Sequence, residues 1–166
     1  MYPWKERTCS FSGCQELKQS QFVAVQSFLN REIDRCVSQG MTCFQSGGNS
    51  GFELLAALAV LQRKLISPQI RLEIVLSCKE QARDWNRLEM DLYCGILRLA
   101  DGIRYTAEHE FNGCRQKRDR YLADSSSRLI CLAASGEQER YLLDYAEAKR
   151  VPVVLFTASD TATNNV

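Results

Sequence analysis

The stretch Met41-Thr-Cys-Phe-Gln-Ser-Gly-Gly-Asn-Ser-Gly-Phe-Glu-Leu-Leu-Ala-Ala-Leu-Ala-Val-Leu61 decides the fold. A short apolar run over 41–45 predicts a strand, and the apolar segment over 52–64 predicts a helix buried on several sides. Three glycines separate them. Such a connection is either a tight turn made for packing or a cradle for an anion. Because the spacing is neither G-x-G-x-x-G nor a Walker A loop, it predicts neither a dinucleotide dehydrogenase nor an ATPase.

Outward from this stretch, short apolar runs alternate with helical patterns. Strands are predicted over 7–12, 41–45, 70–76, 102–106, 128–134 and 151–156. Helices are predicted from a cap at Ser20 to a stop at Gly40, over 52–64, 114–125 and 137–149, and as a long helix with Trp85, Leu88, Leu92, Ile96 and Leu99 at helical spacing.

This alternation predicts an α/β fold: a single Rossmann-like, doubly wound, mainly parallel sheet of about six strands with helices on both faces. Pro152 predicts an edge position for the last strand, because proline cannot donate to the sheet ladder. We expect one domain over 1–156 and a polar, disordered tail over 157–166.

Composition narrows the class of protein. The chain has 166 residues, 45% of them apolar, and a formal net charge of +1, so nucleic acid is not the expected partner. Neither a signal-peptide core nor an apolar window long enough for a membrane span is visible, which predicts a cytoplasmic protein away from membranes. The eight cysteines lack C-x-x-C spacing and His109 is the only histidine. We therefore expect reduced, mostly buried thiols and no metal site.

Ligands of such sheets bind outside the carboxyl ends of the strands. Ser12 and Gly13 end the first predicted strand, and Gly47, Gly48 and Gly51 follow the second. These glycines also precede a helix amino terminus, where free N–H groups and the helix dipole favour an anion. The packing and anion interpretations of the loop both remain open at this point.

The helix predicted over 114–125 is crowded with basic residues. Arg115, Lys117, Arg118 and Arg120 could face a phosphate. Asp124 lies four residues after Arg120, so the alternative is a solvated helix face with a local salt bridge.

Three segments together carry a family resemblance. They are Ser46-Gly-Gly-Asn-Ser-Gly-Phe-Glu-Leu-Leu-Ala56, the pair Gln81 and Trp85, and Phe111-x-Gly-Cys-x-x-x-Arg118-Asp-Arg120-Tyr-Leu-x-Asp124-x-Ser126, with Tyr145-Ala146 in addition. The chain resembles YpsA-like members of the SLOG superfamily, the Rossmann-like group that includes DprA and the LOG phosphoribohydrolases. The resemblance covers about residues 8–156.

The resemblance implies one α/β domain with a pocket for a nucleotide or an ADP-ribose-like molecule. It links the chain to proteins of bacterial cell division, and it brings no established reaction. With the strand-end positions it gives the ligand-binding candidates Ser12, Gly13, Ser46, Gly47, Gly48, Asn49, Gly51, Glu53, Gln81, Arg118, Arg120, Asp124 and Gly136.

The chain departs from the family pattern at two loops. The family's Thr-Gly-His-Arg-Pro is replaced by Ser12-Gly-Cys-Gln-Glu16, and its second glycine pair by Ser135-Gly-Glu-Gln-Glu139. Both changes remove or oppose groups that would attract an anion, because glutamine is uncharged and carboxylates repel phosphate.

Three functions follow. The leading hypothesis is a regulatory domain, not an enzyme, that binds a nucleotide-derived small molecule; protein partners and a homodimer are compatible with it. The second is a LOG-like nucleotide N-glycoside hydrolase, with Glu53 and Arg118 as the catalytic candidates. The third is DprA-like binding of single-stranded DNA, for which Arg104, Tyr105, Arg115, Lys117 and Tyr121 could line a groove.

Overall fold

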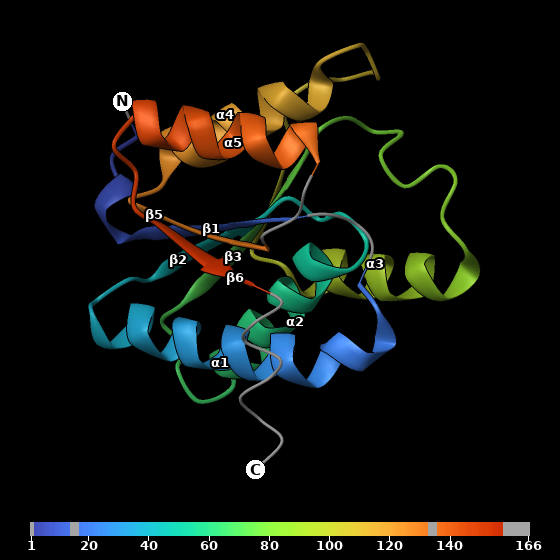
Figure 1. The fold of residues 1–166 in the computed structure, drawn as a ribbon. Coiled ribbons are helices and arrows are strands. Elements are labelled where there is room, and N and C mark those ends of the chain that lie inside the picture. Colours follow the sequence, from blue (N-terminus) through green and yellow to red (C-terminus); the bar gives the residue numbers. More distant parts are fainter. Residues whose placement is uncertain (1, 14–16, 133–135, 158–166) are drawn as a thin grey trace.

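The computed structural model describes residues 2–13, 17–132 and 136–157 (Figure 1). The strands are β1 (Thr8–Ser12), β2 (Cys43–Ser46), β3 (Arg71–Leu76), β4 (Gly102–Tyr105), β5 (Arg128–Leu132) and β6 (Val153–Phe156). The helices are α1 (Phe22–Ser38), α2 (Phe52–Lys64), α3 (Arg87–Leu99), α4 (Cys114–Ser125) and α5 (Glu137–Ala148), with short 3-10 turns at Lys5–Arg7 and Gln19–Gln21.

The described strands form one parallel sheet in the order β4-β3-β2-β1-β5-β6. The chain moves outward from β1 to β4 and then crosses to β5, so the direction of winding reverses between β1 and β5. The predicted doubly wound sheet is confirmed. The edge position of the last strand is also confirmed, since β6 ends the order and Pro152 directly precedes it.

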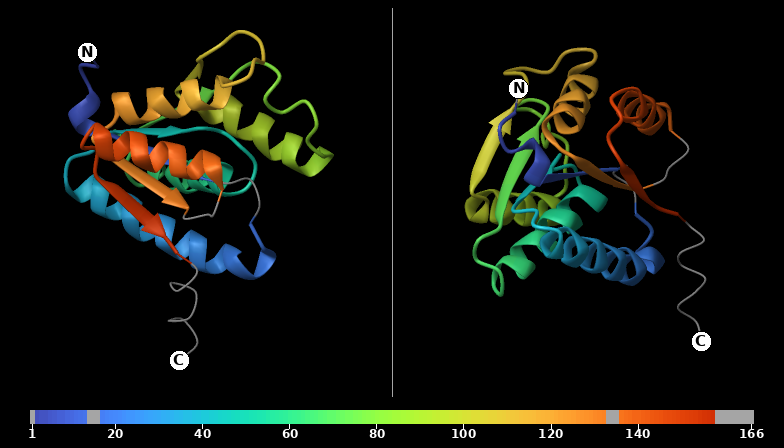
Figure 2. Two further views of the ribbon diagram at one scale, coloured as in Figure 1. Left: turned by 45° about the horizontal axis from the view of Figure 1, so that its top comes forward. Right: turned by 90° about the vertical axis from the view of Figure 1, so that its left-hand side faces the viewer.

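Helices cover both faces of the sheet, as predicted. In Figure 1, α4 and α5 lie above the sheet and α1 and α2 lie below it, and Figure 2 shows the same layers from two further sides. α3 packs beside α2.

The larger core lies between the sheet and the α1–α2 layer. Phe11 and Phe44 stack with ring centroids 6.2 Å apart, and Phe28 lies 5.2 Å from Phe156. α2 buries residues around most of its circumference, including Phe52 and Leu54, which agrees with its nearly all-apolar sequence. A buried helix of this kind holds its amino terminus, and the loop before it, in a fixed place.

Two helix predictions need correction. α3 begins at Arg87 because Asn86 caps it and Glu89 closes a capping box, so Trp85 precedes the helix. Of the predicted apolar stripe only Ile96 is buried on α3, whereas Leu88, Leu92 and Leu99 are exposed.

Ser20 does not cap α1, because a 3-10 turn at Gln19–Gln21 leads into it. Gly40 does end α1, with φ of +85°.

Some predictions fall on residues that the structure does not describe. They are Cys14 to Glu16 of the first loop, residues 133–134 of the fifth predicted strand, Ser135 of the second loop, and residues 158–166 of the tail. The cysteines that are described are all free thiols. Within the described ranges, no helix is both long and apolar enough to cross a membrane.

Candidate functional site

The glycine loop, residues 46–51, connects β2 to α2 at the carboxyl edge of the sheet. Gly48 and Gly51 have φ of +72° and +86°, which favour glycine. Gly47 is required for a different reason, because a Cβ there would lie 2.5 Å from Glu53 Oε2 and 2.9 Å from Arg118 Cζ. At Gly47 the packing interpretation therefore holds, since the protein's own ion pair occupies the space of a side chain.

Glu53 directs its carboxylate back into this loop. Oε2 accepts the backbone N–H of Asn49 at 2.8 Å, while Oε1 accepts the N–H of Gly13 at 3.2 Å and the Ser12 hydroxyl at 3.3 Å. The side chain is completely buried. Donors that sequence analysis assigned to a ligand are thus used by an internal carboxylate.

Arg118 meets Glu53 from α4 on the other face of the sheet. Its five N–H donors all have acceptors: Glu53 Oε1 and Oε2, Asp119 Oδ1 twice, and the Gly47 carbonyl, at 2.8–3.3 Å. The side chain is 1% exposed. In this arrangement Arg118 holds the glycine loop and the helices together and has no donor left for a phosphate.

Asp119 and Gln138 complete the network, and sequence analysis missed both. Asp119 is 1% exposed and accepts from Arg118 and, at 3.4 Å, from Gln138 Nε2 on α5. The sequence did hold a signal that Arg118 itself is buried. It lies four residues after Cys114 and four before Leu122, and all three side chains are buried.

The charges of this network do not balance, because two carboxylates face one guanidinium. Burial raises the pKa of the Glu53 carboxyl above its ordinary value; Arg118 opposes this shift and Asp119 adds to it. Burial would lower the pKa of Arg118, but the charges of Glu53 and Asp119 outweigh it and raise that pKa, so the guanidinium stays charged. Burial and the nearby Asp119 thus both favour the protonated form of Glu53.

Gln81 and Ser46 position the loop from its other sides. Gln81 Nε2 donates to the Gly47 carbonyl at 2.9 Å, while its Oε1 accepts from the Ser77 N–H at 2.7 Å. Ser46 Oγ donates to the Glu53 carbonyl at 2.7 Å and accepts the Gly48 N–H at 3.3 Å. Gln81 lies in the turns before α3 and ties the end of β3 to the loop.

Three predicted residues lie away from the glycine loop. Arg120 is exposed on α4. Asp124 accepts the Tyr145 hydroxyl at 3.1 Å and lies 3.9 Å from Lys149 Nζ, and no Arg120–Asp124 ion pair forms in the described chain. Gly136 precedes α5, where the Glu139 carboxylate would contact a Cβ added to it.

The groups left over are at the start of α2. For the described residues, the backbone N–H groups of Ser50, Gly51 and Phe52 have no hydrogen-bond acceptor. Asn49 is 2% exposed, and its Oδ1 is a buried atom without a partner in the described structure. Ser50 and Gly51 also line a groove of about 690 Å³ between the starts of α1, α2 and α3. Ser50 and Gly51 therefore place two unpartnered N–H donors beside this groove, and the buried Asn49 Oδ1 lies in the loop just before them.

Among the residues described, no three His, Cys, Asp or Glu side chains gather closely enough to hold a metal ion.

The fold and the glycine loop define a doubly wound α/β domain with a glycine-rich opening to its second helix. The family model YpsA, described as "YspA SLOG family", matches residues 13–153. Because this match covers most of the chain, the protein belongs to that SLOG family, and the resemblance stated from the sequence is confirmed.

Two relatives are similar to part of this chain. The UPF0398 protein BH1768 of Halalkalibacterium halodurans is 27% identical over 110 residues, and the UPF0398 protein BBR47_29830 of Brevibacillus brevis is 25% identical over 108 residues. These matches cover 65% and 64% of this chain but only 58% and 57% of the two relatives.

DNA processing protein A from Helicobacter pylori, whose structure concerns its single-stranded DNA binding mode, has a TM-score of 0.64 and 16% identity. The similarity covers 91% of this chain and 65% of that chain, and at this identity it shows the fold alone.

Proposed function

We propose that this SLOG protein is a regulatory domain that binds a nucleotide or nucleotide-derived molecule at the amino terminus of α2. The observation that carries the proposal is the set of unpartnered groups there: the N–H groups of Ser50, Gly51 and Phe52, and Asn49 Oδ1. A buried polar atom without a partner costs free energy that a bound ligand can recover.

The chemistry of these groups favours a ligand with both an anion and hydroxyl or amine donors. The helix dipole and the free N–H groups stabilise a phosphate. Asn49 Oδ1 would accept a hydrogen bond from a sugar hydroxyl or a base amine. Phosphate, sugar and base occur together in a nucleotide, and an ADP-ribose-like molecule offers the same groups.

The hydrolase alternative is less well supported by this geometry. A catalytic carboxylate needs an oxygen free for the substrate, yet both oxygens of Glu53 accept hydrogen bonds from the protein. Arg118 is likewise paired with carboxylates. Ligand binding without a reaction therefore accounts better for the arrangement.

The single-stranded DNA alternative needs free cations beside aromatic rings. Arg104 instead pairs with Glu73 at 3.0 Å and lies 5.2 Å above the Tyr121 ring, and Arg115 donates to Gln138 at 3.3 Å. The likeness to DNA processing protein A favours testing this function, so an oligonucleotide belongs in the ligand panel.

Thermal unfolding with AMP, ADP-ribose, NAD, cyclic dinucleotides and a single-stranded oligonucleotide tests the proposal. A ligand at 100 times its Kd adds about 2.7 kcal/mol to stability, which raises the Tm of a chain of this size by roughly 5–11 °C. We expect such a shift with at least one nucleotide, and a much smaller shift in Asn49→Ala.

Asn49→Ala is a suitable variant because the backbone bonds of Asn49 to Glu53 and Leu54 remain. Asn112→Ala, in the exposed loop before α4, is the matched control and should respond to ligand as the wild type does. Unchanged Tm values with every nucleotide would contradict the proposal. A shift with the oligonucleotide alone would favour the DNA-binding alternative.

A further inference from the structure

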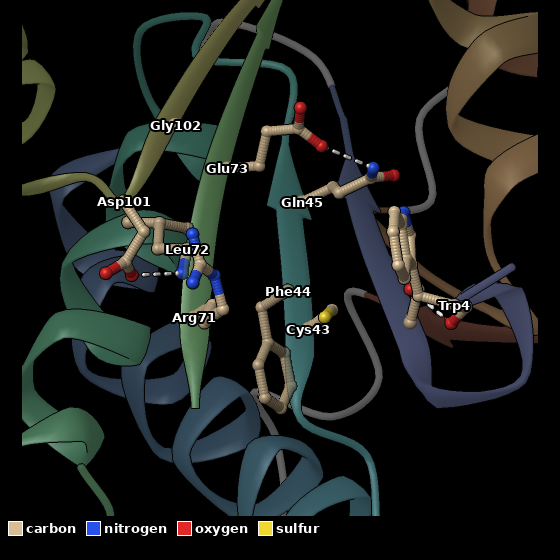
Figure 3. A pocket seen from close by; sticks show the side chains of 10 residues that line it. Trp4, Cys43, Phe44, Gln45, Arg71, Leu72, Glu73, Asp101 and Gly102 are labelled. Atoms are coloured by element: carbon tan, nitrogen blue, oxygen red, sulfur yellow. Dashed lines mark hydrogen bonds between the residues drawn. The ribbon is translucent and has the colours of Figure 1, made fainter. Parts of the chain in front are cut away.

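A second pocket lies at the opposite end of the sheet from the glycine loop. It has a volume of about 430 Å³ and is lined by Trp4 and by the amino ends of β1 to β4 (Figure 3). Its volume is within the range of small-molecule sites. The residues that line this pocket include none of the glycine loop and none of the start of α2.

The strand register fixes the order of the side chains across the pocket. Thr8 of β1 pairs with Cys43 of β2, which pairs with Arg71 of β3. Trp4 lies beside Thr8, whose hydroxyl donates to the Trp4 carbonyl at 2.8 Å. In Figure 3, Cys43 lies between Trp4 and Arg71. In the row Thr8, Cys43 and Arg71, two strand spacings, about 10 Å, separate Thr8 from Arg71.

The acidic groups around the pocket are already neutralised. Glu73 Oε1 accepts from Arg104 at 3.0 Å and its Oε2 accepts from Gln45 at 2.8 Å. Asp101 pairs with Lys64 and accepts the Leu72 N–H at 2.8 Å. The carboxylates therefore leave no uncompensated negative charge facing the pocket.

Two lining side chains make no hydrogen bond or ion pair in the described structure, although the charge of Arg71 helps to lower the pKa of Asp101. Arg71 is exposed, and its guanidinium has no hydrogen-bonded or ion-paired acceptor there. The Trp4 side chain is 65% exposed, although it is one of the largest apolar groups of the chain. An indole offers a face for stacking a planar ring, and a guanidinium binds a carboxylate or phosphate with two parallel hydrogen bonds.

We propose that this pocket binds a small aromatic anion, with its ring on Trp4, its anionic group on Arg71 and Cys43 beneath it. A nucleoside monophosphate and an aryl carboxylate share this chemistry. The site is separate from the one proposed at α2, and neither proposal depends on the other.

Calorimetric titration and protection of Cys43 from iodoacetamide, followed by mass spectrometry, test this site. The probes are AMP and 2-naphthoate, each a ring with an anion, and adenosine and inorganic phosphate, each only one of the two parts. We expect AMP or 2-naphthoate to bind and to protect Cys43. Adenosine and phosphate should bind roughly tenfold more weakly, because each lacks one charged or stacking contact.

Variants assign the binding to the two side chains. Arg71→Gln and Trp4→Ala should each lower the affinity roughly tenfold or more. Arg98→Gln removes an exposed arginine of α3 that does not line the pocket, so it should leave the affinity unchanged. Asn49→Ala should also leave it unchanged.

Protection by AMP alone would identify a nucleotide, and protection by 2-naphthoate alone an aryl carboxylate; both support the site. Absence of protection by either probe at millimolar concentration would overturn it. Equal losses of affinity in Arg71→Gln and Arg98→Gln would also overturn it, as would loss of Cys43 protection in Asn49→Ala.

Discussion

The charged side chains at the two ends of the sheet differ in burial and in pairing. At the carboxyl end, Glu53, Arg118 and Asp119 are almost completely buried, and all five donors of the arginine are paired within the protein. At the amino end, Arg71 is exposed, makes no hydrogen bond or ion pair in the described chain, and acts on Asp101 only through its charge. A charged residue in a family motif, such as Arg118, can therefore hold the fold together through internal pairs, whereas Arg71, outside the motif, stays at the surface.

Replacing an arginine at each end gives the largest contrast. Arg118→Ala leaves two buried carboxylates without a counter-charge and should cost about 3–5 kcal/mol of unfolding free energy. Arg71→Gln changes an exposed, unpaired side chain and should change stability by about 0.5 kcal/mol or less. Urea unfolding followed by circular dichroism measures both. If Arg118→Ala were as stable as the wild type, the buried network would not hold the loop.

Alanine substitutions of one glycine at each end should differ in their cost to stability, by less than the two arginine substitutions do. Gly48 has a positive φ, and a Cβ there would lie 2.8 Å from Leu76 and 2.9 Å from Ile74. Gly48→Ala should therefore cost roughly 1–3 kcal/mol. Gly102→Ala meets only Glu73 Cγ at 3.7 Å and should change stability by less than about 1 kcal/mol. Equal costs in urea unfolding would remove this difference between the two ends.

Acid titration gives a smaller effect that is specific to Glu53. Its folded-state pKa is raised above its unfolded value, so the folded protein binds more protons between the two values. The stability contribution of Glu53 is therefore greatest at acid pH and falls as pH rises through the folded pKa.

The difference in unfolding free energy between wild type and Glu53→Gln should show this trend, because the other titrating groups are common to both proteins. A difference that grows as pH rises would mean that the ion pair with Arg118 outweighs burial, and that the pKa is lowered.

The sequence predicted most of the fold because buried strands and helices repeat their apolar residues with clear periods. The six strands and α4 agree with prediction to within about two residues. The start and the buried face of α3 differ from prediction. The Asn86–Glu89 capping box, a local signal, sets the start, and Tyr93 and Ile96 are the residues that the helix buries. The exposed Leu88 shows that helical spacing alone does not identify the buried face.

The site was less predictable than the fold. The structure has the glycine loop between β2 and α2, as predicted, but its hydrogen bonds to Glu53 depend on contacts between residues 40 positions apart in the chain. Arg118 stays a predicted ligand-binding residue, and its bonds to Gly47 and Glu53 reach two other elements. The Trp4–Arg71 pocket has no sequence motif, because it forms only where the starts of four strands meet.

The most direct test of the central claim is an amide chemical-shift map of the protein titrated with the nucleotide that raises its Tm. The account predicts changes at the N–H groups of Ser50, Gly51 and Phe52 and at the Asn49 side chain, with the Nε–H signal of Arg118 unchanged. A large change at Arg118 Nε–H, with Ser50 and Gly51 unaffected, would contradict the account, because the arginine would then leave its carboxylates to bind the ligand.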